Sequence, residues 1–160
     1  MPAIVCDASP LVVLAKLGAL DAIPDSFSPV MVPRAVLAEI EAGTPDDPIR
    51  HQLPSLGWLR PVELTPALSP LAWFNLGRGE SEVIEFARLT PGAFALLDDR
   101  AARRTASALG IPVVGTLGLL ALRVARDPAL TWEATVSRLR DVGMYLDEET
   151  VRKAAERLGR

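Results

Sequence analysis

Cysteine and histidine are nearly absent from this sequence, which contains only Cys6 and His51 among its 160 residues. One cysteine cannot form an intrachain disulfide, and the two residues together are too few for a Cys/His zinc site or a Cys–His nucleophile pair. Any chemistry must therefore depend on oxygen ligands. We expect Cys6 to be buried as a small apolar residue and His51, in a proline-rich stretch, to lie on the surface.

Long apolar runs are missing as well. The densest ones, 9–15 and 116–125, are well below the roughly 18 positions that cross a membrane, so we expect no transmembrane helix. No basic residue precedes Asp7, so we expect no secretion signal and a cytoplasmic protein. Hydrophobic residues make up 49% of the sequence, which is enough to form the core of one compact domain.

Lysine is scarce, because only Lys16 and Lys153 accompany 15 arginines. Residues 1–99 contain 13 acidic and 6 basic side chains, a net charge of −7, and residues 100–160 contain 7 and 11, a net charge of +4. This asymmetry predicts separate acidic and basic surfaces, and arginine binds phosphate with two parallel hydrogen bonds. The alternative is a genome-wide bias toward arginine codons.

Short apolar runs alternate with helical patterns along the chain. We expect strands at 3–6, 29–32, 94–97 and 111–114, a short extended piece at 58–62, and helices at 9–18, 33–42, 77–89, 98–109, 116–126, 131–141 and 147–158. This alternation predicts an α/β fold, with three α/β/α layers and a mainly parallel sheet. We expect residues 1–126 to form its core and 127–160 a helical extension of the same domain.

Proline marks helix starts and one predicted insertion. Ser9-Pro10 has the pattern of an N-cap followed by the first helical residue, and Ser69-Pro70 repeats it. The proline-rich segment 44–70, with at most a short helix at 48–53, is predicted to be a surface insertion.

Four segments place acidic residues where an α/β fold positions its site. Asp7 ends the first strand and Asp98-Asp99 end the strand at 94–97, so a parallel sheet brings them to one edge. Glu39 and Glu80 lie in neighbouring helices. Converging carboxylates repel one another unless a cation binds, and Mg²⁺ or Mn²⁺ prefers such oxygen ligands. A site of this kind hydrolyses phosphodiesters.

Each acid also has a structural explanation. Asp7 and Asp99 could be helix N-caps, Glu80 could complement a helix dipole, and Glu39 could lie on a solvated face. This explanation is weaker for Asp7, because Ser9 is expected to cap that helix. Only one of Asp98 and Asp99 can cap the next helix, so helix capping leaves the other unexplained.

The acidic segments resemble a known family. Its motifs match Ile-Val-Cys-Asp7-Ala-Ser9-Pro-Leu, Val-Pro-Arg-Ala-Val-Leu-Ala-Glu39, Gly-Arg-Gly-Glu80-Ser-Glu-Val-Ile, Leu-Leu-Asp98-Asp99-Arg100 and Gly115-Thr116-Leu-Gly. Each motif is weak alone, but five in the right order over residues 3–126 are similar to the PIN-domain superfamily, near the VapC-type toxins.

This resemblance implies a Mg²⁺- or Mn²⁺-dependent endoribonuclease, the toxin of a toxin–antitoxin pair, with RNA as substrate and an antitoxin protein as partner. Asp7, Glu39 and Glu80 match the first three acids of the family. The last acid is Asp98 or Asp99, and Asp99 is favoured because Asp-Arg follows the family pattern. The third acid is more often aspartate in the toxins, so the longer Glu80 is expected to alter metal binding.

Further residues are candidates for contacting nucleic acid. Arg100, Arg103 and Arg104 follow the last acid and could bind the phosphate backbone, with Ser9 and Thr116 near the site and Arg123 and Arg126 further along the basic half. A solvated helix face explains the arginines equally well, and helix capping explains Thr116.

The helices at 9–18 and 69–89 are more apolar than a monomer's surface tolerates, and PIN-like domains commonly pair through N-terminal helices, so we expect a homodimer.

Two other function classes compete with the ribonuclease. One is a PIN-like module that binds RNA or protein without turnover. The other is a phosphoryl-transfer or receiver-type domain, which the Asp98-Asp99 pair could suggest. That pair lies in the wrong half of the chain, and no lysine is placed near the sheet edge, so the sequence disfavours this class.

Overall fold

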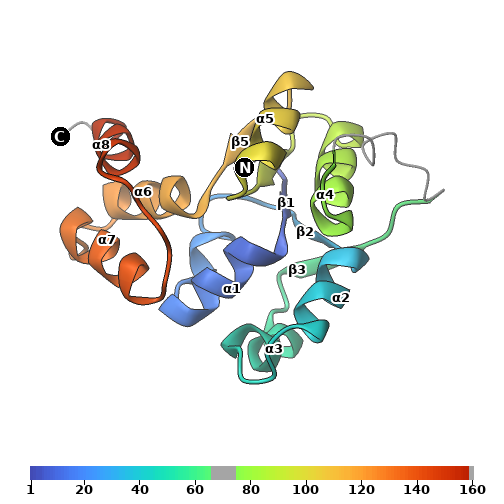
Figure 1. The fold of residues 1–160 in the computed structure, drawn as a ribbon, viewed down its shortest axis with the longest axis horizontal. Coiled ribbons are helices and arrows are strands. Elements are labelled where there is room, and N and C mark those ends of the chain that lie inside the picture. Colours follow the sequence, from blue (N-terminus) through green and yellow to red (C-terminus); the bar gives the residue numbers. More distant parts are fainter. Residues whose placement is uncertain (66–74, 159–160) are drawn as a thin grey trace.

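The computed structural model describes residues 1–65 and 75–158, and this part of the chain contains one five-stranded sheet (Figure 1). The strands are β1 (Ile4–Cys6), β2 (Val30–Pro33), β3 (Leu59–Val62), β4 (Phe94–Leu96) and β5 (Val113–Val114), in the order β3-β2-β1-β4-β5. All neighbouring strands run parallel. The predicted α/β class is confirmed. The helix expected to start at Ser69-Pro70 lies outside the described residues.

The central strand β1 is completely buried because helices cover both faces of the sheet. Ile4 and Val5 have no exposed surface, as expected for a short apolar strand in a parallel sheet. Ile4 is paired with Val30 of β2 on one side and with Phe94 of β4 on the other. The N–H of Asp7 donates to the carbonyl oxygen of Leu96 at 3.1 Å. The carboxyl ends of β1 and β4 therefore lie side by side.

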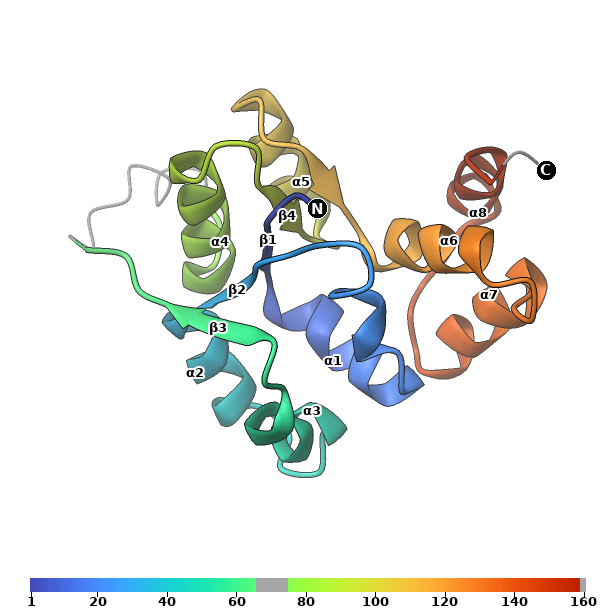
Figure 2. The same ribbon diagram turned by 180° about the vertical axis from the view of Figure 1, so that it is seen from behind.

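The described residues form eight α-helices, arranged in layers around this sheet (Figures 1 and 2). They are α1 (Ala8–Leu17), α2 (Arg34–Ala42), α3 (Pro48–Gln52), α4 (Arg78–Leu89), α5 (Arg100–Ala108), α6 (Thr116–Arg126), α7 (Trp132–Asp141) and α8 (Glu148–Glu156), with 3₁₀ turns η1 (Leu20–Ala22) and η2 (Leu53–Ser55). Helix α4 packs between α2 and α5, whereas α1 packs against α3, α6 and α7. The fold is a three-layer α/β/α domain.

Helix α1 begins earlier than its sequence predicts. Asp7, not Ser9, occupies the N-cap position, and Pro10 is the third helical residue. Proline is tolerated there because the N–H groups of the first turn have no partner within the helix. Ser9 is therefore an exposed residue of the first turn. Its predicted role as the N-cap is wrong.

The proline-rich stretch is integrated into the fold rather than inserted on its surface. Ile49 of α3 is fully buried, and α3 packs against α1 and α2. Four residues of β3, including Pro61, pair with β2. Proline is compatible with this position because β3 is an edge strand. For the described residues 44–65, the prediction of an insertion is wrong.

Helices α6, α7 and α8 gather at one end of the molecule, as both views show (Figures 1 and 2). Arginines join this end to the α1–η1 segment. Arg123 forms an ion pair with Asp21 at 2.7 Å, and Arg138 donates to the Leu17 carbonyl oxygen at 2.7 Å. No helix in residues 1–65 or 75–158 is long and apolar enough to cross a membrane.

Candidate functional site

Four elements bring five acidic residues to the carboxyl edge of the sheet. Asp7 follows β1, Asp98 and Asp99 follow β4, Glu39 lies on α2 and Glu80 lies in the first turn of α4. Their charges act on one another: Glu80, Glu39 and Asp98 raise the pKa of Asp7, and Asp99 and Glu39 raise the pKa of Glu80. The side chains named from sequence thus share one electrostatic environment.

Asp7 is the buried member of this group, with 4% of its surface exposed. Burial raises the pKa of its carboxyl group to about 7, and the neighbouring acids add to this effect, although the adjacent Ala8 amide opposes it. Within the described residues, its Oδ1 atom has no hydrogen-bond partner. Asp7 occupies an N-cap position, yet its side chain makes no capping hydrogen bond. Capping therefore does not explain this carboxylate.

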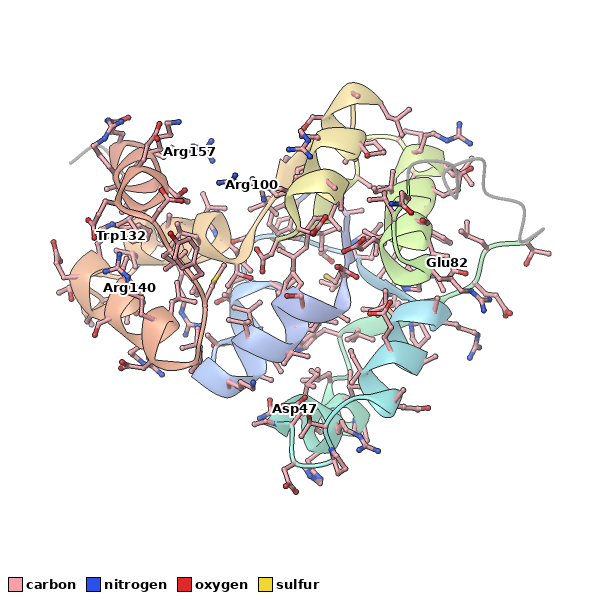
Figure 3. The ribbon with its side chains drawn as sticks, in the orientation of Figure 1. Asp47, Glu82, Arg100, Trp132, Arg140 and Arg157 are labelled. Atoms are coloured by element: carbon pink, nitrogen blue, oxygen red, sulfur yellow. The ribbon has the colours of Figure 1, made fainter. Side chains whose placement is uncertain are left out.

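Glu39 and Glu80 are positioned by contacts between α2 and α4. Gly79 is buried beneath the Glu39 side chain, and a β-carbon at residue 79 would overlap Oε1 of Glu39. Glu82 of α4 accepts a hydrogen bond from the N–H of Ala35 in the first turn of α2, at 3.3 Å, and Figure 3 shows Glu82 between the two helices. The glycine thus lets the Glu39 carboxylate approach the start of α4.

Glu80 is half-buried at the third position of α4. Its Oε2 accepts the N–H of the N-cap residue Gly77 at 3.3 Å, which is one half of a capping box. Burial raises the pKa of Glu80, while this hydrogen bond lowers it. Glu80 therefore has its predicted structural role at the start of α4 and also belongs to the acidic group.

The Asp98-Asp99 pair has two different structural partners. Asp99 is the N-cap of α5 and its Oδ2 accepts the Ala102 N–H at 2.9 Å. Asp98 accepts the Thr116 N–H at 2.8 Å through Oδ1 and the Thr116 hydroxyl at 2.6 Å through Oδ2. One acid therefore caps the following helix, as expected, and the other holds the start of α6.

Thr116 is fully buried, and its hydroxyl group donates to Asp98. Thr116 therefore positions the Asp98 carboxylate, and its hydroxyl is used in this bond instead of the predicted contact with nucleic acid. Gly115 permits this packing, because a β-carbon there would lie 2.6 Å from Nη1 of Arg103 and 3.0 Å from Oδ1 of Asp98. Gly115 and Thr116 therefore hold the Asp98 carboxylate in position.

The basic residues named from sequence divide into two groups. Arg100, which directly follows Asp99, is exposed, and so are Arg104 and Ser9. Arg103 instead donates to the Leu97 carbonyl oxygen at 2.8 Å, and Arg126 donates to the Asp25 carbonyl oxygen at 3.1 Å and to the Ser26 hydroxyl. Arg123 is paired with Asp21. The predicted phosphate contacts of Arg123 and Arg126 are therefore replaced by contacts within the fold.

The acids lie near one another without forming a tight cluster. In residues 1–65 and 75–158, no three His, Cys, Asp or Glu side chains are close enough together to hold a metal ion. A Mg²⁺ ion does not require such a cage, because it keeps several waters and commonly binds through one or two carboxylates plus substrate phosphate. The buried, unpartnered Oδ1 of Asp7 among these acids fits a hard divalent cation.

A cleft that begins at Asp98 is lined by three residues that were not identified from sequence: Tyr145, Lys153 and Arg157. The positive charge of residues 100–160 was the only sign of them in the sequence.

Comparison with known proteins identifies the family. A search of curated proteins gives no match to the chain. A family model described as a PIN domain matches residues 3–160, nearly the whole length. This match agrees with the parallel sheet and with the acids at its carboxyl edge. The chain therefore belongs to the PIN-domain family, whose members are in general nucleases.

Proposed function

We propose that this protein is an endoribonuclease that hydrolyses RNA phosphodiesters with Mg²⁺ or Mn²⁺ as cofactor. The observation that carries this proposal is the Asp7 carboxylate, which is buried, without a partner for Oδ1 among the described residues, and close enough to Glu80, Glu39 and Asp98 for their charges to act on it. Burying the Asp7 carboxylate within reach of other acidic side chains destabilises a fold, so the arrangement is better explained by a ligand of positive charge.

The candidates to hold the cation are Asp7, Glu39, Glu80 and Asp99, with Asp98 as the alternative last ligand; one or two of them would bind it directly and the others through the waters that it keeps. When bound, it would acidify water and offset charge on the phosphoryl oxygens. The Asp98 carboxylate is fixed by two hydrogen bonds from Thr116, and the Asp99 carboxylate by one from the Ala102 amide. These bonds keep both side chains at the edge of the sheet.

Burial and the neighbouring acids raise the pKa of Asp7 to about 7 without a metal, and a bound cation would lower it by favouring the carboxylate. The exposed side chains of Arg100 and Arg104 follow the last acid and are available to bind phosphate.

The test is cleavage of a generic single-stranded RNA in Mn²⁺. We expect Asp7→Asn to reduce the rate by roughly 100-fold or more, because metal ions contribute several kcal/mol to stabilising such transition states. Asp46→Asn, which removes an exposed acid on the α2–α3 loop, serves as the matched control and should cut normally. Cleavage by Asp7→Asn at the wild-type rate would refute this assignment of the site. A wild-type protein that binds RNA without cutting it would favour the PIN-like binding module.

We also propose that the protein is cytoplasmic and acts as the toxin of a toxin–antitoxin pair; the support is the similarity of its five motifs to the VapC-type branch. Induced expression should then arrest growth of a bacterial host, and the Asp7→Asn variant should not. A small neighbouring gene whose product relieves the arrest would identify the antitoxin. Normal growth with the wild-type protein at high expression would contradict this role.

The structure gives the proposed homodimer less support than the apolar helices of the sequence do. Six of the ten residues of α1 are buried within the protomer, so the apolar character of this helix is largely used inside the fold. Leu89 at the end of α4 is 59% exposed and remains available for pairing. Sedimentation equilibrium at micromolar concentration should give twice the mass of 17.2 kDa. A single species of 17.2 kDa would exclude the homodimer.

A further inference from the structure

A cleft of about 560 Å³ adjoins the acidic group and is closed on its far side by the C-terminal helix α8. Asp98, Arg100 and Arg103 line one wall, and Lys153 and Arg157 line the other. The volume lies within the range of pockets that enclose small organic ligands. The cleft can therefore accommodate a group the size of one nucleotide, but it is too small for a duplex.

The charges in this cleft are not balanced. Four cationic side chains line it, namely Arg100, Arg103, Lys153 and Arg157, against two carboxylates. Asp98 and Asp147 accept hydrogen bonds from neutral groups of Thr116 and Thr150, which leave their charges in place, and the Thr150 bonds and the charge of Arg100 lower the pKa of Asp147. The four cations therefore exceed the two carboxylates by two charges.

Two of the cations face each other across the cleft. Figure 3 shows Arg100 of α5 and Arg157, just beyond α8, reaching into the space between the two helices. Among the described residues, neither forms an ion pair. Lys153 is held by an exposed pair with Glu149 at 2.7 Å, which contributes little and can be exchanged for another anion. Cations placed this way repel one another until an anion binds between them, and arginine side chains match phosphate in geometry.

An aromatic ring stands at the rim of the same cleft. Tyr145, in the segment between α7 and α8, is 88% exposed, although Leu146 beside it is buried. A large ring with so little contact to its own protein presents an open face. Bases of single-stranded nucleic acids stack on such faces.

We infer that this cleft binds a nucleotide of single-stranded RNA next to the scissile phosphodiester, with Arg100, Lys153 and Arg157 on its phosphate and Tyr145 against its base. The inference rests on the proposed function, because Asp98 links the cleft to the acidic group. An acidic protein segment would match the cations but would leave the exposed ring without a partner, so RNA explains more of the observed features. The C-terminal helix is then part of the substrate-binding surface.

The first experiment separates binding from cleavage. Binding of a short fluorescein-labelled single-stranded RNA is measured in EDTA over a range of salt concentrations, for wild type and for Lys153→Ala/Arg157→Ala. Each lost phosphate contact should reduce the log–log salt slope by about 0.7, so the double variant should lose about 1.4 in slope and bind roughly ten-fold more weakly. Arg152→Ala is the matched control, because Arg152 lies on α8 and pairs with Glu156 outside the cleft.

The second experiment addresses the aromatic ring. Tyr145→Ala should weaken binding by roughly 5- to 100-fold at unchanged salt slope, the range measured for loss of one stacked base. Tyr145→Phe keeps the ring and should bind as wild type does. A stability role would not produce this pattern, because the side chain is almost wholly exposed.

These measurements distinguish the inference from the proposed function. If Lys153→Ala/Arg157→Ala binds RNA as tightly as wild type, the inference is wrong, and an acidic protein segment becomes the better candidate for the cleft. If the double variant and Tyr145→Ala lose binding while the wild type cuts no RNA in Mn²⁺, the cleft stands and the proposed nuclease activity fails. If the wild type cleaves RNA but the double variant does so with an unchanged KM, the activity stands and the cleft assignment fails.

Discussion

Asp98 binds Thr116 through both oxygens of its carboxylate. Oδ1 accepts the backbone N–H at 2.8 Å and Oδ2 accepts the hydroxyl at 2.6 Å. The pair joins the end of β4 to the first residue of α6, and Thr116 has no exposed surface. Hydrogen bonds to a charged acceptor are short and strong in such surroundings. Thr116 is therefore a positioning residue for an acid at the edge of the sheet.

Replacing Thr116 by valine tests this relationship. Thr116→Val keeps the shape of the side chain but removes the hydroxyl donor, so we expect a loss of about 2 kcal/mol in the free energy of unfolding. Thr116→Ser keeps the donor and should lose much less. Urea unfolding of both variants measures the difference. Equal stability of the valine variant and wild type would show that the hydroxyl bond contributes nothing.

Gly79 and Glu39 lead to a second prediction. A β-carbon at residue 79 would overlap Oε1 of Glu39 and lie 3.1 Å from its Cδ. Because Glu39 is an exposed residue with a flexible side chain, Gly79→Ala should displace the carboxylate and leave the fold intact. Mn²⁺ affinity, measured by calorimetry, should fall roughly ten-fold, as it does when groups that orient metal ligands are lost.

Two controls make this prediction specific. Gly57→Ala introduces a methyl group where no heavy atom lies within 4 Å, so Mn²⁺ affinity should not change. In a Glu39→Gln background, Gly79→Ala should have little further effect, because both changes act on one carboxylate. Additive losses in the double variant would show that Gly79 acts independently of Glu39.

The buried strands and most helix ends could be predicted from sequence, because short apolar runs and capping residues determine them locally. The extended piece predicted at 58–62 is the edge strand β3, but its pairing with β2 could not be predicted, since Arg60 and Pro61 interrupt its apolar pattern and the pairing depends on a distant segment. The start of α1 was misplaced because Asp7 and Ser9 are both good N-caps and Pro10 fits either choice.

The candidate site was also only partly predictable from sequence. Because parallel strands end at one edge, the sequence was sufficient to place Asp7 near Asp98 and Asp99, whereas Glu39 and Glu80 lie on helices and were named together with them through their motifs. The partner of Thr116 lies 18 residues away and that of Arg123 lies 102 residues away. Side-chain pairs at such separations depend on tertiary packing, which no local pattern predicts.

Asp7 makes stability depend on pH. Its pKa is raised from 3.8 to about 7 by burial and by Glu80, Glu39 and Asp98. Below pH 3.8 both states bind the proton. Between these values the folded state keeps a proton that the unfolded state has lost, so stability falls as pH rises. Above pH 7 this loss is complete, and Asp7→Asn, which carries no charge, should be more stable than wild type by up to about 4 kcal/mol.

Thermal melts of wild type and Asp7→Asn from pH 4 to pH 8 measure this difference. The two melting temperatures should lie close together at pH 4 and diverge toward pH 8. Mg²⁺ at pH 8 should raise the melting temperature of wild type and leave Asp7→Asn nearly unchanged, since a cation relieves the repulsion only where the charge exists. A constant difference across the pH range would show that the pKa of Asp7 is the same in the folded and the unfolded protein, which would contradict the raised value.

Asp99 is expected to combine two roles that one substitution can separate. Its Oδ2 caps α5 at the Ala102 N–H, whereas Oδ1 remains free for a cation within the described structure. Asp99→Ser keeps a capping oxygen and removes the charge, and Asp99→Ala removes both. Serine and aspartate cap helices about equally well, and alanine costs about 1 kcal/mol.

If Asp99 is the last ligand, Asp99→Ser should unfold at the wild-type urea concentration but bind Mn²⁺ more weakly, and Asp99→Ala should lose both stability and affinity. Asp98→Asn provides the comparison, because its carboxylate already accepts two hydrogen bonds from Thr116 and contributes less to the cation than to the start of α6. It should therefore reduce stability more than Mn²⁺ affinity. The opposite ranking is loss of Mn²⁺ affinity in Asp98→Asn and unchanged affinity in Asp99→Ser. It would assign the last ligand to Asp98, because removing the charge of a direct ligand weakens cation binding even where the helix cap is kept.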